Sequence, residues 1–71
     1  MAIEWIEVSS DRITHYAYDT ESATIYVIFK KGGTQWRYED CTAEHWEQFQ
    51  LADSKGKFIN EELNRHPHGA A

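Results

Sequence analysis

Residues 23–38 read ATIYVIFKKGGTQWRY and have the pattern of a β-hairpin. Positions 25–29 hold five β-branched or aromatic residues in succession, which favours a strand. The Gly-Gly pair at 32–33 can adopt the positive φ angles of a two-residue turn, and residues 34–38 then return as the next strand. The pattern predicts the central hairpin of an antiparallel sheet.

The segments before this hairpin extend the sheet. Residues 13–18 (ITHYAY) form another β-prone run, separated from the hairpin by a turn at 19–22. Residues 3–8 (IEWIEV) alternate imperfectly and predict a short strand or an extended arm. We therefore expect three to four strands, with residues 1–7 as an N-terminal strand or arm.

After position 38 the apolar spacing changes to that of helices. Thr42 is a candidate N-cap, and apolar residues follow at positions 43, 46, 49 and 52. A second helix is predicted from Lys57 to about Asn64, before Pro67 stops it. The prediction is an α+β domain over residues 8–64, an antiparallel sheet with two C-terminal helices packed on one face. Residues 65–71 are expected to be a flexible tail.

Composition restricts the class of protein. The chain has 71 residues, enough for one domain only, and 41% hydrophobic with 27% charged residues is a globular balance. The formal net charge of -5 disfavours a polyanionic partner and suits a protein partner with a basic surface. A protein of this size and charge would fit a phage or mobile-element accessory role.

Cysteine and hydropathy patterns predict a cytoplasmic protein. Cys41 is the only cysteine, so no internal disulfide can form. The N-terminus lacks the pattern of a signal peptide, and no run approaches the roughly 18 apolar residues that span a bilayer. No membrane partner is expected.

Turn geometry predicts which side chains share a face. A two-residue turn at Gly32-Gly33 would place Phe29 opposite Trp36, and a loop at 19–22 would pair Tyr18 with Ala23. The face for the helices then holds Tyr16, Tyr18, Ile25, Val27, Phe29, Trp36 and Tyr38. The opposite face holds Ile13, His15, Ala17, Thr24, Tyr26, Ile28, Gln35 and Arg37.

This second face is the predicted partner-binding surface. Two helices cover one side of a small sheet, so His15, Tyr26, Ile28 and Arg37 would lie on the other side. Exposed aromatic and aliphatic side chains beside an arginine are typical of a binding patch. The alternative is that the arm folds over this face with Trp5 as a lid.

Several short motifs together resemble one known family. They are Val8-Ser9-Ser10 with Tyr18-Asp19, Ile25-x-Val27-x-Phe29, Trp36-Arg37-Tyr38 and Ala52-x-Ser54-x-Gly56-x-Phe58-x-Asn60. In this order they are similar to the KTSC family, named after a C-terminal domain of some lysyl-tRNA synthetases. Members also occur alone, as short bacterial or phage proteins.

The resemblance implies a hairpin sheet with C-terminal helices and no catalytic residues, and we expect no cofactor. RNA binding has been suggested for the family. Here Trp36 replaces the first tyrosine of the family's Tyr-x-Tyr signature, and Cys41-Thr42 replaces its Val-Pro. Cys41 thus stands at an apolar position of the family, which indicates a buried packing thiol.

A set of basic residues is the alternative, nucleic-acid-binding site: Lys30, Lys31, Arg37, Lys55 and Lys57. If the loops at 30–31 and 55–57 converge, their lysines and exposed N–H groups could hold a phosphate. The alternative without a ligand is that these residues serve solubility and turn formation, with Ser54 as a cap and Gly56 in a left-handed conformation.

Catalytic and metal sites are not expected. Cys41 with His45 lacks an orienting third group, and His66 and His68 lie on the predicted tail without a cysteine pair. We therefore predict a non-catalytic interaction module that binds a protein partner or forms a homodimer through the second face. RNA binding is the alternative.

Overall fold

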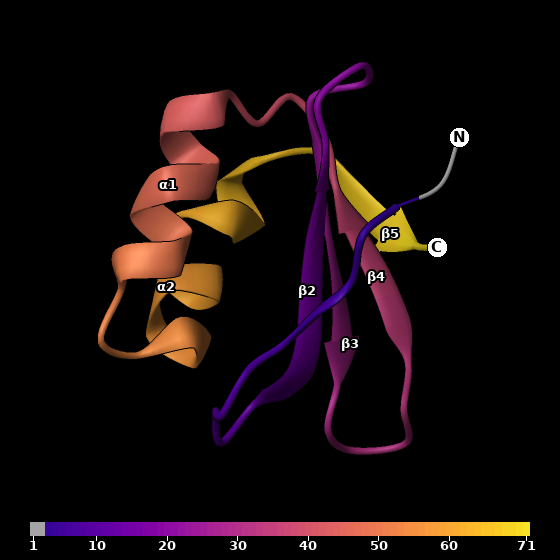
Figure 1. The fold of residues 1–71 in the computed structure, drawn as a ribbon, viewed down its shortest axis with the longest axis vertical. Helices are drawn as coiled ribbons and strands as arrows, with labels where there is room; N and C mark the ends of the chain where they lie inside the picture. The colour runs from indigo at the N-terminus through magenta and orange to yellow at the C-terminus, as the bar shows by residue number, and fades with distance from the viewer. Residues whose placement is uncertain (1–2) are drawn as a thin grey trace.

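The computed structural model describes residues 3–71 as two layers, a sheet and a set of helices on one of its faces (Figure 1). The sheet is antiparallel and five-stranded, with order β1-β2-β3-β4-β5. In chain order the elements are β1 (Ile6–Glu7), β2 (Ile13–Asp19), β3 (Thr24–Phe29), β4 (Gln35–Tyr38), α1 (Ala43–Leu51), α2 (Lys55–Glu61), the 3-10 turn η1 (Leu63–Arg65) and β5 (His68–Ala70). The α+β prediction with two helices on one face is confirmed.

The β3–β4 hairpin has a longer loop than predicted. The N–H of Phe29 donates to the carbonyl of Thr34 (2.8 Å), and Val27 rather than Phe29 lies opposite Trp36. The loop is therefore residues 30–33, with Gly32 and Gly33 at φ 78° and 64°. The predicted register is wrong by two residues, but side chains alternate with period two, so each residue of this hairpin keeps its predicted face.

The β2–β3 pairing differs in the same way, with one further change. Tyr18 pairs with Ile25 instead of Ala23, and the register shifts between Ile13 and His15. This bulge turns Ile13 into the core, where it is 0% exposed, so its predicted place on the opposite face is wrong. His15 keeps its predicted face.

Phe49 of α1 lies at the centre of the core, between the sheet and α2. Its ring contacts those of Tyr16 (centroids 5.4 Å apart) and Phe58 (5.2 Å). The buried core comprises Ile13, Tyr16, Ile25, Val27, Tyr38, Cys41, Phe49, Ile59 and Leu63. All seven residues predicted to face the helices thus belong to this core or pack against it.

Both helices begin at side-chain caps. Thr42 Oγ1 accepts from the N–H of His45 (3.2 Å), which confirms the predicted cap of α1. Ser54 Oγ accepts from the N–H of Lys57 (3.2 Å), so α2 begins at Lys55, two residues before the prediction. Gly56 is helical rather than left-handed. A Cβ on Gly56 would lie 3.2 Å from Arg12 Cβ, so glycine lets α2 approach the start of β2.

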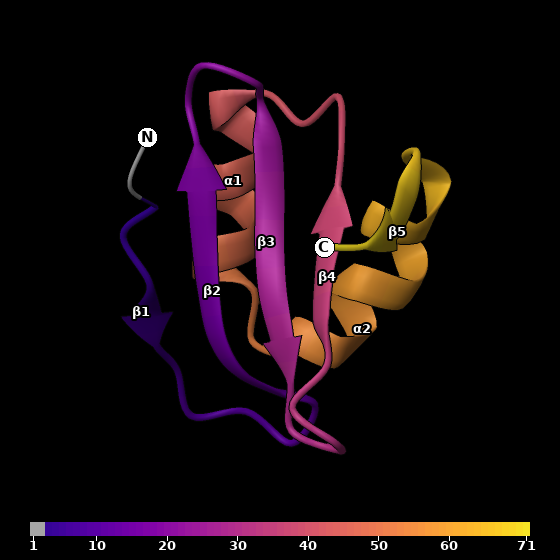
Figure 2. The same cartoon turned by 90° about the vertical axis from the view of Figure 1, so that its right-hand side faces the viewer.

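The C-terminal residues differ from the predicted flexible tail, because His68–Ala70 form strand β5 on the free edge of β4 (Figure 2). The N–H of Glu39 donates to the carbonyl of Pro67 (2.7 Å), and the N–H of Ala71 donates to that of Gln35 (3.1 Å). Pro67 does follow the last helical turn, as predicted, but the chain then returns along the sheet. Within residues 3–71, no helix has the length and hydropathy needed to cross a membrane.

Cys41 is a buried packing thiol, as the family position indicated. It is 0% exposed, and its thiol donates to the carbonyl of Tyr38 (S to O, 3.4 Å). Burial raises the pKa of the Cys41 thiol to about 11, and the carboxylate of Asp40 adds to this effect. The backbone at Cys41 is also fixed, because Tyr18 Oη donates a hydrogen bond to the Cys41 carbonyl (2.7 Å).

The raised pKa of Cys41 predicts a loss of stability at alkaline pH. An unfolded thiol titrates near 9.0 and the folded one near 11, so the folded state holds more protons in this window. The free energy of unfolding should therefore fall as pH rises through it, by on the order of 2 kcal/mol from this residue. Urea denaturation with reductant between pH 8 and 11 measures the change.

The Cys41→Ala variant is the control, because it keeps every tyrosine but lacks the thiol. The stability advantage of the wild-type protein over this variant should shrink between pH 8 and 11. An advantage that stays constant across this range would show that the thiol does not titrate differently in the two states.

Candidate nucleic-acid interface

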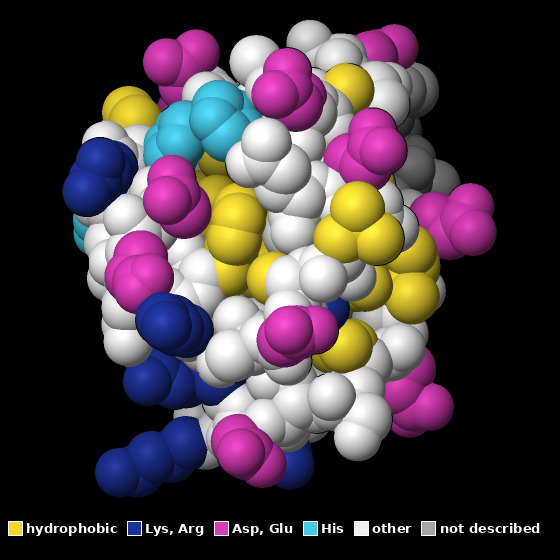
Figure 3. Space-filling model, turned by 90° about the vertical axis from the view of Figure 1, so that its left-hand side faces the viewer, with side chains coloured by type: hydrophobic (Ala, Val, Ile, Leu, Met, Phe, Trp, Pro, Cys, Tyr) yellow, Lys and Arg dark blue, Asp and Glu magenta, His cyan; other side chains and the backbone are white. Residues whose placement is uncertain are grey.

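Five of the seven Lys and Arg residues lie at the end of the sheet that carries the β3–β4 loop. They are Arg12, Lys30, Lys31, Lys55 and Lys57, and they line two neighbouring cavities. Figure 3 shows most of the dark blue side chains gathered toward one lower corner of the helix-covered side. The chain is acidic as a whole, yet its positive charge is concentrated at one end.

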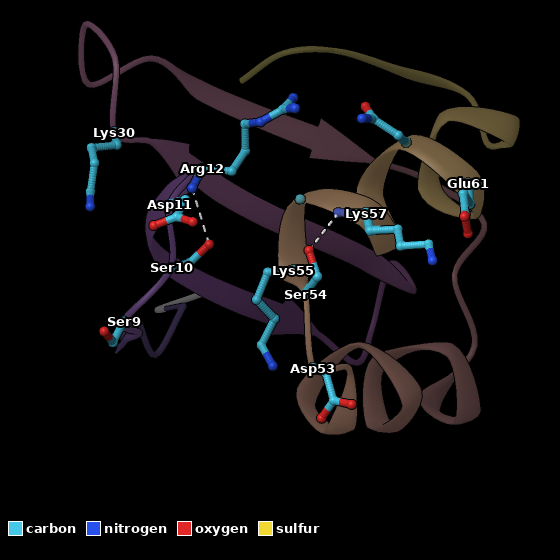
Figure 4. Close-up of a pocket in the computed structure, with 12 residues that line it drawn as sticks. Ser9, Ser10, Asp11, Arg12, Lys30, Asp53, Ser54, Lys55, Lys57 and Glu61 are labelled. Carbon is cyan, nitrogen blue, oxygen red and sulfur yellow. Dashed lines mark hydrogen bonds between the residues drawn. The ribbon is translucent and has the colours of Figure 1, made fainter.

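The first cavity lies between the start of β2, the β3–β4 loop and the first turn of α2 (Figure 4), and its volume is about 730 Å³. Lys55 is already engaged there, because its Nζ donates to the carbonyls of Gln50 (3.0 Å) and Ala52 (2.7 Å) at the end of α1. Arg12, Lys30 and Lys57 are exposed. Three carboxylates also line this cavity, those of Asp11, Asp53 and Glu61.

The second cavity, here called the aromatic groove, lies on the helix side of the hairpin and has a volume of about 420 Å³. Its lining residues are Arg12, Phe29, Lys31, Thr34, Trp36, Tyr38, Ile59, Asn60, Asn64 and His68. In the part of the chain that the structure describes, no carboxylate lines it. Arg12 and Asn60 line both cavities, so the two are adjacent.

Aromatic side chains form the floor of the groove. Phe29 and Trp36 are half-buried and pack against the edge of the core. Tyr38 is buried beneath them, and this burial raises its pKa to about 12, an effect that the nearby positive charge of Arg12 reduces. The effect of Arg12 indicates that its guanidinium lies close to the Tyr38 hydroxyl.

Strand β5 supplies another wall of the groove through His68. The His68 ring lies 6.3 Å from that of Trp36 and 5.6 Å from that of Tyr38, measured between centroids. Sequence reasoning missed His68 as a site residue because the segment was predicted to be a flexible tail. It also missed Arg12, Asn60 and Asn64, whose positions depend on the β2 bulge and on the packing of α2.

The predicted nucleic-acid-binding set is only partly brought together. Lys30, Lys31 and Lys57 border the cavities, whereas Lys55 acts as a C-terminal cap of α1. Arg37 does not join them, because it alternates to the opposite face of β4 from Trp36 and Tyr38. The structure therefore separates Arg37 from the other members of the predicted set.

The predicted partner-binding residues do share the face that no helix covers. His15 lies opposite Ile28, Tyr26 lies opposite Arg37, and all four side chains are half-buried. Trp5 of the arm packs edge-on against Tyr26 (centroids 6.4 Å apart), so it covers part of this face. The sequence posed an open patch and a Trp5 lid as alternatives, and the structure has a face that is partly open and partly covered by Trp5.

Arg37 is engaged within the protein. Its Nε lies 3.2 Å from Glu39 Oε2 in an ion pair, and its Nη1 donates to the carbonyl of Ala70 in β5. The guanidinium also lies against Gly69, whose Cβ position is 3.4 Å from Nη1. Arg37 therefore holds β5 in place, a role that its sequence position did not reveal.

The Cys41 and His45 side chains do not form a nucleophile and base. The thiol is buried and its pKa is raised, whereas the Nδ1 of His45 accepts from the N–H of Thr42 (3.2 Å) as part of the helix cap. His45 and His66 have ring centroids 5.0 Å apart. Across residues 3–71, no group of three His, Cys, Asp or Glu side chains is placed to hold a metal ion.

Comparison with known proteins gives the family of this chain. The crystal structure of the KTSC domain protein YPO2434 from Yersinia pestis matches it with a TM-score of 0.90 and 24% identity, over 99% of both chains. At this identity the likeness shows the shared fold alone. A search of curated proteins gives no match. The model of the KTSC domain matches residues 9–66, which is most of the chain, and the chain therefore belongs to the KTSC domain family.

Proposed function

We propose that this chain is a non-catalytic, cytoplasmic module that binds RNA at its basic end. The observation that supports this most directly is the convergence of Arg12, Lys31 and Lys57 on two neighbouring cavities. These residues come from three separate segments, the start of β2, the β3–β4 loop and α2. Neutralisation of phosphates by Lys and Arg is the main source of affinity for RNA.

The net charge of -5 is compatible with this proposal because charge acts locally. The longest axis of the domain is 28 Å, whereas surface charges are screened over about 8–10 Å at physiological salt. The β2–β3 turn with Asp19 and Glu21 lies at the end of the sheet opposite the β3–β4 loop (Figure 1). A phosphate at the basic end is therefore influenced mainly by the charges close to it, which are the cations of both cavities and the carboxylates of the first.

The two cavities should contribute unequally to binding. In the first, the carboxylates of Asp11, Asp53 and Glu61 offset much of the positive charge. In the aromatic groove, Arg12 and Lys31 stand beside neutral amides and aromatic rings. We therefore place the main RNA contact in the groove, with Lys30 and Lys57 as supporting contacts.

Charge reversal at the groove tests RNA binding. Lys31→Glu should weaken binding of a fluorescein-labelled single-stranded octamer of RNA by roughly tenfold, because it replaces a phosphate contact with a repulsive charge. The slope of log affinity against log salt should also become shallower, by about 0.7 for the lost contact. Fluorescence anisotropy between 50 and 200 mM salt measures both.

Arg65→Glu is the matched control, since it makes the same change of net charge at an exposed residue that lines neither cavity. It should change affinity by much less than Lys31→Glu. Equal losses in the two variants would mean that the groove is not the site. An undetectable affinity of the wild-type protein at 50 mM salt would refute RNA binding.

A second candidate function uses the helix-free face of the sheet. Tyr26 and Ile28 lie side by side along β3, half-buried, and Trp5 extends the apolar surface over Tyr26. This surface carries no cluster of basic residues, so its ligand would be an apolar protein surface, from a partner or from a second copy of the chain.

The Ile28→Ser variant tests this surface. If the face binds a protein, the variant should lose a partner that the wild-type protein captures from lysate after nuclease treatment, with little dependence on salt. Sedimentation velocity of the pure proteins tests self-association in the same way. Leu51→Ser is the control, because Leu51 is 75% exposed at the end of α1. Retention of the same partner or the same oligomer by Ile28→Ser would exclude the helix-free face.

A further inference from the structure

We propose that the aromatic groove takes one unpaired base of a single-stranded RNA, stacked on Trp36, with the flanking phosphates on Lys31 and Arg12. This inference rests on the proposed RNA binding and specifies the class of RNA. It also assigns the direction in which the bound strand continues, from the groove past Arg12 into the first cavity.

The position of Trp36 is the first argument. Trp36 is opposite the buried Val27, yet its side chain stays half-buried and lines the aromatic groove. Its ring lines a cavity of about 420 Å³, within the usual range for small-ligand sites. Stacking of a base on such a ring is a common source of affinity in single-strand binders and tolerates any base.

The polar residues around Trp36 match the other parts of a nucleotide. Lys31 and Arg12 provide positive charge for phosphates on the rim. Asn60 and Asn64 provide amides, which both donate and accept hydrogen bonds as base edges and ribose hydroxyls require. The absence of a carboxylate in the described lining leaves these cations uncompensated within the groove.

The adjacent first cavity gives room for more than one nucleotide of the bound strand. Arg12 and Asn60 line both cavities, and Lys30 and Lys57 lie beyond them in the first cavity. A strand with one base in the groove can therefore place its next phosphates near Arg12 and then near Lys57. A free mononucleotide would use the groove alone.

The size of the groove argues against a duplex. A groove of about 420 Å³ admits one base and its sugar, but a paired base remains stacked inside its helix and cannot reach Trp36. Double-stranded RNA would meet only the rim cations. Its affinity should therefore be lower than that of an unpaired strand of the same length.

The test compares ligands and Trp36 variants by fluorescence anisotropy. The ligands are a labelled RNA octamer, the same octamer paired with its complement, and unlabelled mononucleotides as competitors. Trp36→Leu should weaken binding of the single strand by roughly 5- to 150-fold, the range found for loss of one stacked base. The salt slope should stay unchanged, because no phosphate contact is removed, and Trp36→Phe should restore most of the affinity.

Trp5→Leu is the control, because Trp5 packs on the opposite face of the sheet. Circular dichroism and thermal unfolding identify any variant that fails to fold, in which case Trp36→Phe and the comparison of ligands still decide. A duplex that binds as tightly as the single strand, or an unchanged affinity of Trp36→Leu, would overturn this inference while the Lys31→Glu result still supports RNA binding. Mononucleotides that compete as well as the octamer would overturn the path into the first cavity.

Discussion

Phe49 makes the contact on which both layers of this domain depend. Its ring is 0% exposed and touches Tyr16 of the sheet, Trp46 of its own helix and Phe58 of α2. Truncation of a buried phenylalanine typically costs about 3–5 kcal/mol, which is a large part of the 5–15 kcal/mol by which a whole domain is stable. The contact thus joins β2 to both helices. The aromatic groove lies at the edge of this packing, where Phe29 and Trp36 of the hairpin meet Ile59 and Asn60 of α2.

Much of the fold could be predicted because its signals are local. The five-residue apolar run of β3, the Thr42 cap and the apolar spacing of α1 each depend on neighbouring residues. The face assignment survived a wrong register because both hairpin errors were of two residues. The bulge beside His15 and strand β5 could not be predicted in this way, since each depends on contacts with distant segments. Strand β5 forms because the edge of β4 offers backbone N–H and C=O groups for pairing, although residues 68–70 have no strand propensity of their own.

The candidate site also combines features that the local sequence predicts with features that depend on contacts between distant segments. Lys30, Lys31 and Lys57 could be identified from the sequence as basic loop residues, but their convergence with Arg12 requires the packing of α2 against the start of β2. The total charge does not reveal that five of the seven Lys and Arg residues gather at one end of the sheet. Arg37 had the residue type of a contact residue, yet alternation along β4 places it on the other face, where β5 engages it.

The two faces of the sheet are connected through β5. On the helix-free face, Arg37 binds Glu39 and the Ala70 carbonyl and rests on Gly69. Successive residues of a strand point to opposite faces of the sheet. The contacts that hold β5 against β4 therefore also position His68 on the helix side, where it forms a wall of the aromatic groove. The ladder of β5 is only three residues long, so the contribution of one charged side-chain contact is large relative to its few backbone bonds. Arg37 on one face and His68 on the other are therefore both held by contacts of the same short strand, although no residue lines both candidate surfaces.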